Sequence, residues 1–297
     1  MKYRTIKTLC FLVTCVVPLF VHADDDGTLI FSVNGDSVTV TGCVDSCPEA
    51  LVIPSKIQDV SVTQIGSSAF SGATSLTSVT LPDSLTTIGS SAFSGATNLV
   101  SINLPGSVTS IADYAFQDTG LTSITIPDAV VSIGNYAFQG AALTSLTLGS
   151  GLTTIGDMAF WQTDITSLTI PDSVTFIGRQ AFGDTPLKTL VIGNGLSDQS
   201  RVGRDAFLNV CQTLESVAID SPGALGRANR YTSSFTRRDG QEVYFTGYTG
   251  LHFGRFYDDT GRSYNPTAYQ CPKLETITLG DNVVTVGDYA FDAREDL

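Results

Sequence analysis

The dipeptide Ala-Phe recurs through this chain at nearly constant spacing, and this constrains the fold more than any other feature. The first six copies follow one another at 22 or 23 residues, and the step to the seventh is 25. The Phe residues are Phe70, Phe93, Phe116, Phe138, Phe160, Phe182, Phe207 and Phe291. A period of this length is typical of repeat architectures, in which units bury their apolar side chains only by stacking. The spacing therefore predicts a solenoid with one continuous core.

Other positions keep the same phase. Ile-Gly or a close variant precedes each Ala-Phe, and a short segment rich in Val, Ile and Thr follows it. These segments begin at Leu76, Leu99, Leu121, Leu143, Ile165, Leu187, Leu214 and Leu274. Their composition favours strands, and the Pro or Gly that ends most of them favours a turn. Each repeat is thus expected to hold a strand, a turn, a second extended piece, and a tight helical or 3₁₀ turn that carries Ala-Phe.

The long gap between Phe207 and Phe291 is explained by an insertion. Ala268-Tyr269 fits the Ala-Phe position, because Tyr269 lies 22 residues before Phe291 and five before Leu274. One repeat then carries about 40 extra residues, which we place at about 222–263. We expect residues 24–50 to form an N-terminal cap and residues 51–297 to form the solenoid.

These units resemble BspA-like leucine-rich repeats, and segment 121–138, LTSITIPDAVVSIGNYAF, carries the resemblance most clearly. It covers roughly residues 50–297 apart from the insertion. The resemblance implies a solenoid of short parallel strands and a surface or secreted role in adhesion and protein binding. It brings no catalytic residues with it.

The N-terminus has the pattern of an export signal. Lys2, Arg4 and Lys7 precede an apolar stretch from Leu9 to Val21, and Val21-His22-Ala23 has the form of a cleavage site. Residues 1–23 are therefore predicted to be a signal peptide. The apolar stretch is short for a membrane span, and no other segment approaches the required length. We expect a secreted or cell-surface protein.

Charge narrows the range of partners. The chain carries a formal net charge of −13, and removal of the signal would make the remainder more acidic. Nucleic acid and anionic lipid are disfavoured as partners of such a surface, whereas a protein or a glycan remains open. The acidity also has a simpler explanation, because net charge keeps an exported protein soluble.

The cysteines outside the signal suggest two disulfides. Cys43 and Cys47 bracket a tight loop, and a bridge there would staple the cap. Cys211 and Cys271 each lie three residues before the first Leu of their strands, so they should occupy equivalent positions in adjacent coils. Paired strands lie about 4.8 Å apart, within the Cα separation of about 4.4–6.8 Å that a disulfide needs. Free buried thiols are the alternative for this second pair.

The insertion differs in composition from the repeats, because it is rich in aromatic residues and arginine. Both types are enriched at binding hot spots, and long insertions in repeat proteins are often functional. The candidate ligand-binding residues are Tyr231, Phe235, Arg237, Arg238, Tyr244, Tyr248, His252, Arg255 and Tyr257. The alternative is a small satellite core, for example a β-hairpin that uses residues 242–247.

The sequence contains no phosphate-binding loop, nucleophile elbow or dinucleotide-binding glycine motif. His252 is the single histidine outside the predicted signal, which disfavours His-based triads and multi-histidine metal sites. We expect no enzyme activity, no metal and no cofactor. The strands do carry two arrays of Ser and Thr that should face solvent, one of which begins at Ser78 and the other at Thr80. Such a face can bind a repetitive ligand such as a glycan, or it can simply be an exposed sheet.

The sequence thus predicts a non-catalytic binding or adhesion module for a protein or glycan ligand. The alternative is a structural envelope or spacer protein without a specific ligand.

Overall fold

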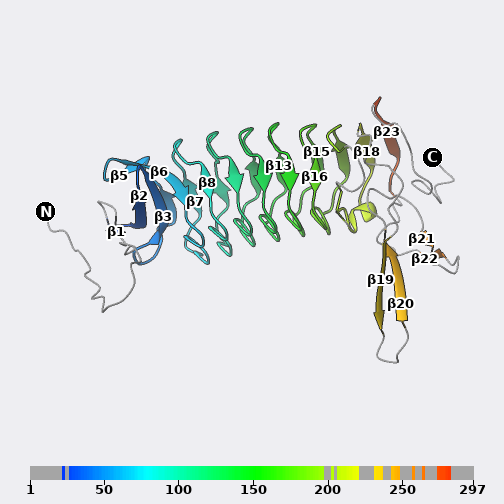
Figure 1. The fold of residues 1–297 in the computed structure, drawn as a ribbon, viewed down its shortest axis with the longest axis horizontal. Helices are drawn as coiled ribbons and strands as arrows, with labels where there is room; N and C mark the ends of the chain where they lie inside the picture. Colours follow the sequence, from blue (N-terminus) through cyan, green and yellow to red (C-terminus); the bar gives the residue numbers. More distant parts are fainter. Residues whose placement is uncertain are drawn as a thin grey trace.

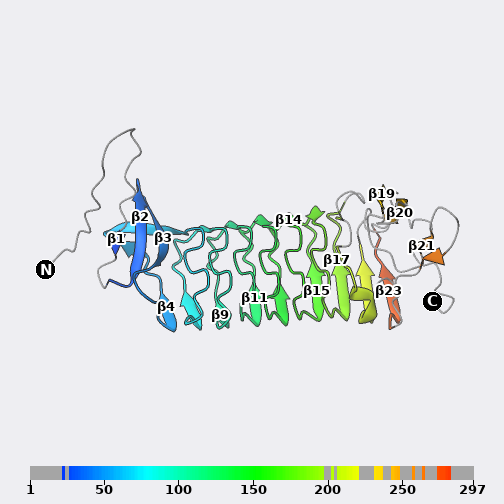
Figure 2. The same ribbon diagram turned by 90° about the horizontal axis from the view of Figure 1, so that it is seen from below.

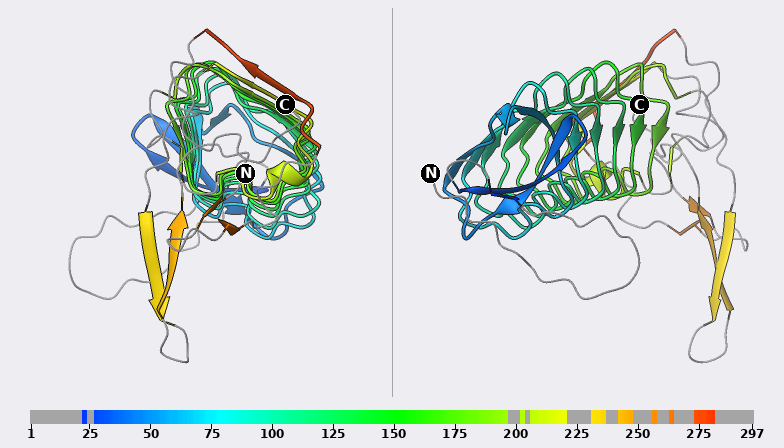
Figure 3. Two further views of the ribbon diagram at one scale, coloured as in Figure 1. Left: turned by 90° about the vertical axis from the view of Figure 1, so that its right-hand side faces the viewer. Right: turned by 60° about the vertical axis from the view of Figure 1, so that its left-hand side comes forward.

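The chain forms an elongated solenoid of about eight turns, seen in a computed structural model (Figure 1). The structure describes residues 22–23, 27–196, 202–203, 206–220, 231–236, 242–247, 256–257, 263–264 and 273–281. Successive coils superpose when viewed along the long axis, as Figure 3 shows. The predicted repeat solenoid with short parallel strands is confirmed.

One side of the solenoid, here called the strand face, is built from the Val-, Ile- and Thr-rich segments (Figure 2). All neighbours that pair along it run parallel. Its strands are β4 (Ala50–Val52), β7 (Ser78–Thr80), β9 (Ser101–Ile102), β11 (Ser123–Thr125), β13 (Ser145–Thr147), β15 (Ser167–Ile170), β17 (Thr189–Ile192), β18 (Ser216–Ile219) and β23 (Thr276–Leu279). They form three consecutive sheets, β4-β7-β9, β11-β13 and β15-β17-β18-β23.

The last pairing on the strand face spans the predicted insertion. Strand β23 pairs directly with β18, with Ser216 opposite Thr276 and Val217 opposite Ile277. The strands of the insertion lie between these two strands in sequence but not in the sheet. The placement of Leu274 in the repeat, which predicted this stacking, therefore describes the last coil correctly.

A second side carries the short extended pieces that end at Ile-Gly. They form one sheet, in the order β6, β8, β10, β12, β14 and β16, all parallel. The bounds are β6 (Val60–Ile65), β8 (Thr87–Ile88), β10 (Ser110–Ile111), β12 (Ser132–Ile133), β14 (Thr154–Ile155) and β16 (Phe176–Ile177). The isolated bridge between Ile177 and Val202 continues the series by one coil.

An N-terminal cap closes this second sheet. Strands β1 (His22–Ala23), β2 (Leu29–Asn34) and β3 (Ser37–Cys43) run antiparallel to one another, and β3 then pairs with β6 in parallel. The short strand β5 (Lys56–Ile57) pairs antiparallel with β6. A disulfide joins Cys43 to Cys47 with a Cα separation of 5.4 Å, and it staples the loop that follows β3.

The third side, the turn edge, consists of the turns that carry Ala-Phe, such as 89–98. The turns are of the expected 3₁₀ type, because N–H groups bond the carbonyl three residues earlier, as Ala92 N–H does to Gly89 O at 3.2 Å. The turn after Phe207 contains the 3₁₀ helix η2 (Val210–Gln212). The turns around Phe70 to Phe182 also place a residue in the left-handed region just before Ala-Phe. Ser91, for example, has φ of 55°. This φ interrupts helical winding and lets alternate N–H groups point at the next coil, as in Phe93 N–H to Ala115 O at 2.8 Å.

The interior is built from columns of identical position in successive coils. The buried Phe rings stack face to face from Phe70 to Phe207, with ring centroids 5.1–5.5 Å apart. Leu and Ile columns fill the remainder, for example Leu99, Leu121 and Leu143, each with no exposed area. Every column meets its own kind above and below, so the apolar side chains merge into one core.

Candidate binding surface

The aromatic and arginine-rich insertion contributes a two-stranded ribbon. Strands β19 (Tyr231–Thr236) and β20 (Glu242–Gly247) pair antiparallel over six residue pairs, from Tyr231 opposite Gly247 to Thr236 opposite Glu242. The ribbon projects away from the coils near the C-terminal end of the solenoid (Figure 1). The β-hairpin that the sequence offered as an alternative for residues 242–247 is therefore present. A second small pair joins β21 (Phe256–Tyr257) to β22 (Ser263–Tyr264).

The predicted site residues of the insertion fall partly on these strands. The backbones of Tyr231 and Phe235 lie in β19, that of Tyr244 in β20 and that of Tyr257 in β21. The remaining candidates, Arg237, Arg238, Tyr248, His252 and Arg255, lie outside the described residues. The same holds for Cys271, so its bridge to Cys211 stays a prediction.

The strand face is a regular surface of short parallel strands that runs along the solenoid. The inward side chains of β11 and β15, such as Ile124 and Leu168, are at most 4 % exposed, while their neighbours in sequence point outward. The outward residues of the central strands are exposed serines and threonines: Ser123, Thr125, Ser145, Thr147, Ser167 and Thr169. This is the alternation of a half-buried sheet, and both hydroxyl arrays face solvent as predicted.

Hydroxyl groups in this protein divide into two classes. Those beside the second sheet donate to carbonyls of the preceding coil, as Thr153 Oγ1 does to Val131 O at 3.0 Å and Thr86 Oγ1 to Thr63 O at 3.1 Å. The outward hydroxyls of β11, β13 and β15 make no hydrogen bond within the described part of the protein. These hydroxyls therefore remain available to a ligand.

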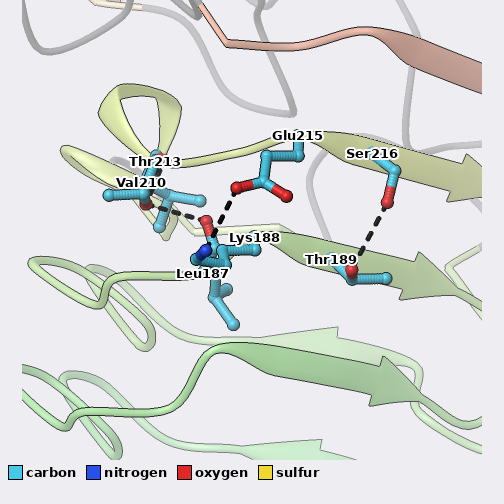
Figure 4. Close-up of polar contacts among 7 residues, drawn as sticks. All are labelled: Leu187, Lys188, Thr189, Val210, Thr213, Glu215 and Ser216. Carbon is cyan, nitrogen blue, oxygen red and sulfur yellow. Dashed lines mark hydrogen bonds and ion pairs between the residues drawn. The ribbon is translucent and has the colours of Figure 1, made fainter.

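Charge changes along the strand face. The outward positions from β7 to β15 carry no ionisable residue. On the coils of β17 and β18, Lys188 Nζ lies 3.2 Å from a carboxylate oxygen of Glu215, and both side chains are about half exposed (Figure 4). The hydroxyls beside this ion pair bond to each other, Ser216 to Thr189 at 3.4 Å. Among the described residues, the neutral region with unpaired outward hydroxyls therefore reaches from β7 to β15 and ends before β17.

The ionisable side chains of the described residues bear on two kinds of chemistry, metal binding and proton binding. Among the described residues no cluster of three or more His, Cys, Asp or Glu side chains is arranged to hold a metal ion. The Asp128 carboxylate accepts hydrogen bonds from the backbone N–H of Ser150 at 2.7 Å and from its hydroxyl at 2.9 Å. These bonds stabilise the charged form and lower the pKa of Asp128 below its ordinary value of 3.8. The arrangement locks two neighbouring turns together.

Comparison with known proteins shows which family the repeats belong to. The family model of the BspA type leucine rich repeat region matches six copies, over residues 49–121, 109–225 and 255–297. The chain belongs to the BspA-type leucine-rich repeat family. Proteins of this family are in general non-enzymatic and bind proteins, and they are typically found at the cell surface or secreted. Residues 226–254, which the family model leaves unmatched, lie within the predicted insertion.

Solved structures of bacterial leucine-rich repeat proteins share this fold. The T. pallidum leucine-rich repeat protein is 25 % identical, with a TM-score of 0.52, and the match covers 60 % of this chain and 88 % of that one. A leucine-rich repeat protein of Bacteroides ovatus is 23 % identical over 89 % of this chain and 78 % of its own, with a TM-score of 0.45. A leucine rich cell surface protein of Faecalibacterium prausnitzii is 23 % identical over 90 % and 72 %, with a TM-score of 0.46.

No curated protein sequence matches this BspA-type protein. Within the described residues, none of the helical structure is long or apolar enough to cross a bilayer.

Proposed function

We propose that this protein is a secreted or cell-surface binding module that recognises a protein or glycan ligand without catalysing a reaction. The observation that carries this proposal is the strand face of the middle coils. A continuous core holds these strands in register, and their exposed hydroxyls have no partner in the described parts of the chain. A rigid surface loses little conformational entropy when a ligand binds, so its unpaired polar groups can form hydrogen bonds at a lower cost in free energy.

The insertion adds a second contact region to the proposed module. Its candidate residues are aromatic or cationic, and these types supply most anchor residues in protein interfaces. The ribbon β19-β20 stands clear of the coils, so a partner can reach it from several directions (Figure 3). Among the described strands, β19 and β20 pair with each other and with no third strand, and an edge strand of this kind can accept an additional strand from a partner.

The proposed export rests on the N-terminal sequence and on the family. Expression of the full chain in a bacterial host, followed by fractionation and N-terminal sequencing, tests it directly. We expect the exported form to begin at Asp24. Full-length chain retained in the cytoplasm would contradict this part of the proposal.

Binding is tested with the purified full chain against immobilised extracellular proteins and neutral glycans, read by biolayer interferometry. Two variants accompany it: deletion of 222–263 with a short Gly-Ser linker, and Thr125→Arg with Thr147→Arg to obstruct the strand face. A binding module should capture at least one ligand, and one variant should lose it while circular dichroism shows the same fold. A spacer protein would capture none, and that result would sink the proposal.

A further inference from the structure

The strand face is interrupted between β13 and β15. Strands β11 and β13 share three residue pairs and β15 and β17 share four, but β13 and β15 are not paired with each other. A hollow of about 400 Å³ opens at this interruption, lined by residues of both strands and by Pro171. Its size falls within the range of about 300–1,000 Å³ that is usual for small-ligand sites.

The floor of the hollow is apolar, and this distinguishes β13 from its neighbours. Leu146 and Leu148 line the hollow and are only partly buried. The equivalent residues of the adjacent coils are fully buried: Ile124, Leu168, Ile126 and Ile170 are at most 4 % exposed. The core is therefore accessible from solvent at this point of the strand face and covered on both sides of it.

The rim of the hollow carries hydroxyl groups. Ser145, Thr147, Ser167 and Thr169 line it, and none of them makes a side-chain hydrogen bond among the described residues. Thr144 is the exception, because its hydroxyl already donates to Thr122 O at 3.1 Å. Each free hydroxyl can donate one hydrogen bond and accept two, so the rim can exchange bonds with a polyhydroxylated ligand.

We infer that this hollow is a binding site for a neutral glycan, with one sugar ring seated between β13 and β15. This inference rests on the proposed binding function and names the ligand class of the strand face. A sugar ring has an apolar face of C–H groups and a rim of hydroxyls, and the hollow presents the same two chemistries in the same order. Sugar units next to the seated ring on the side of β11 then meet its outward hydroxyls, those of Ser123 and Thr125.

Other ligand classes fit this hollow less well. No lysine or arginine lines it, so an anionic glycan would lose hydration of its charges without gaining a counter-charge. It offers no aromatic or arginine anchor of the kind that dominates protein interfaces. A crystalline ligand would need an unbroken array of hydroxyls along the strand face, and the missing pairing between β13 and β15 interrupts that array.

The test uses the full chain and a panel of neutral oligosaccharides, with dextran sulfate as the anionic comparison, followed by isothermal titration and methyl NMR. The site variant is Thr147→Val with Thr169→Val, which keeps shape and strand propensity but removes two rim hydroxyls. The matched control is Thr74→Val with Thr97→Val, two exposed threonines of the turn edge whose hydroxyls are also unpaired. Thermal unfolding verifies that both variants fold.

We expect at least one neutral oligosaccharide to bind and to shift the methyl signals of Leu146. Its affinity should fall about tenfold in the site variant, because two hydrogen bonds to the rim are lost. The control should bind within twofold of wild type. Equal binding by the site variant, or preference for dextran sulfate, would overturn the inference. If no neutral oligosaccharide binds while a protein ligand is captured, the inference fails and the proposed function stands. If nothing binds, both fail.

Discussion

The turn edge and the strand face use the same side chains for different ends. At the turn edge, the hydroxyls of Thr119, Thr163 and Thr185 are buried and donate to the carbonyl of the Phe three residues earlier, at 2.8–2.9 Å. On the strand face, the hydroxyls of Thr125, Thr147 and Thr169 are exposed and donate to nothing in the described protein. Threonine therefore completes the backbone on one side and is left free on the other.

The backbone explains this division. In coils that carry Gly-Ala after the Phe turn, a backbone N–H bonds the Phe carbonyl, as Ala96 N–H does to Phe93 O at 3.1 Å. In coils that carry Thr at the position of that Ala, the hydroxyl takes over this role. At the outward positions of the strand face, the backbone bonds run between strands where these pair, and the threonine hydroxyls take no part in them. Threonine hydroxyls thus complete the backbone at these turns and are free for binding at the outward positions of β11, β13 and β15.

The largest expected effect is a difference in stability between a substitution in the core behind the turn edge and one on the strand face. Phe138→Ala should lower the free energy of unfolding by about 3–5 kcal/mol, because it opens a cavity in the stack between Phe116 and Phe160. Thr147→Ala should cost no more than about 0.5 kcal/mol, as is usual for exposed sites. Urea denaturation followed by circular dichroism measures both. Similar losses of unfolding free energy in the two variants would contradict the difference between the two regions.

Substitution by glycine should change the stability of the protein in opposite directions at the turn edge and on the strand face. Ser91 at the turn edge has φ of 55°, where a side chain costs about 1–2 kcal/mol and glycine fits without strain. Ser91→Gly should therefore stabilise the protein by about 0.5 kcal/mol once the greater chain entropy of glycine is subtracted. Ser101→Gly, in β9, should destabilise it by about 0.5–1 kcal/mol. Thermal unfolding of the pair decides the matter, and a shared sign would show that turn strain is not the cause.

The smallest effect concerns pH. Asp128 has a pKa below 3.8 in the folded protein, so its contribution to stability is complete above that value and is lost as the pH falls through the lowered pKa. Asp128→Asn keeps an oxygen acceptor for the Ser150 N–H but does not titrate. Melting temperatures of the two proteins should therefore converge as the pH drops from 5 toward 2. A constant difference across that range would exclude the carboxylate as the source.

Sequence reasoning captured what the repeat dictates. The Phe and Leu columns, the parallel strands and the stacking of Leu274 on Leu214 follow from spacing alone, because only identical side chains in register can fill such a core. The left-handed residues could not be foreseen, since Ser91, Tyr114 and Met158 share no chemistry that favours positive φ. The closure of the coils imposes it. The hollow was equally hidden, because Leu146 reads like its buried counterparts.

The central claim is that hydroxyls at the turn edge hold the fold while those of the strand face do not. One comparison of unfolding free energies tests it: Thr119→Val, Thr163→Val and Thr185→Val in one chain, and Thr125→Val, Thr147→Val and Thr169→Val in another. Each turn-edge change leaves a buried carbonyl unpaired and should cost about 1–3 kcal/mol, whereas the strand-face triple should stay close to wild type. Equal losses in the two chains, or a greater loss in the second, would contradict the account.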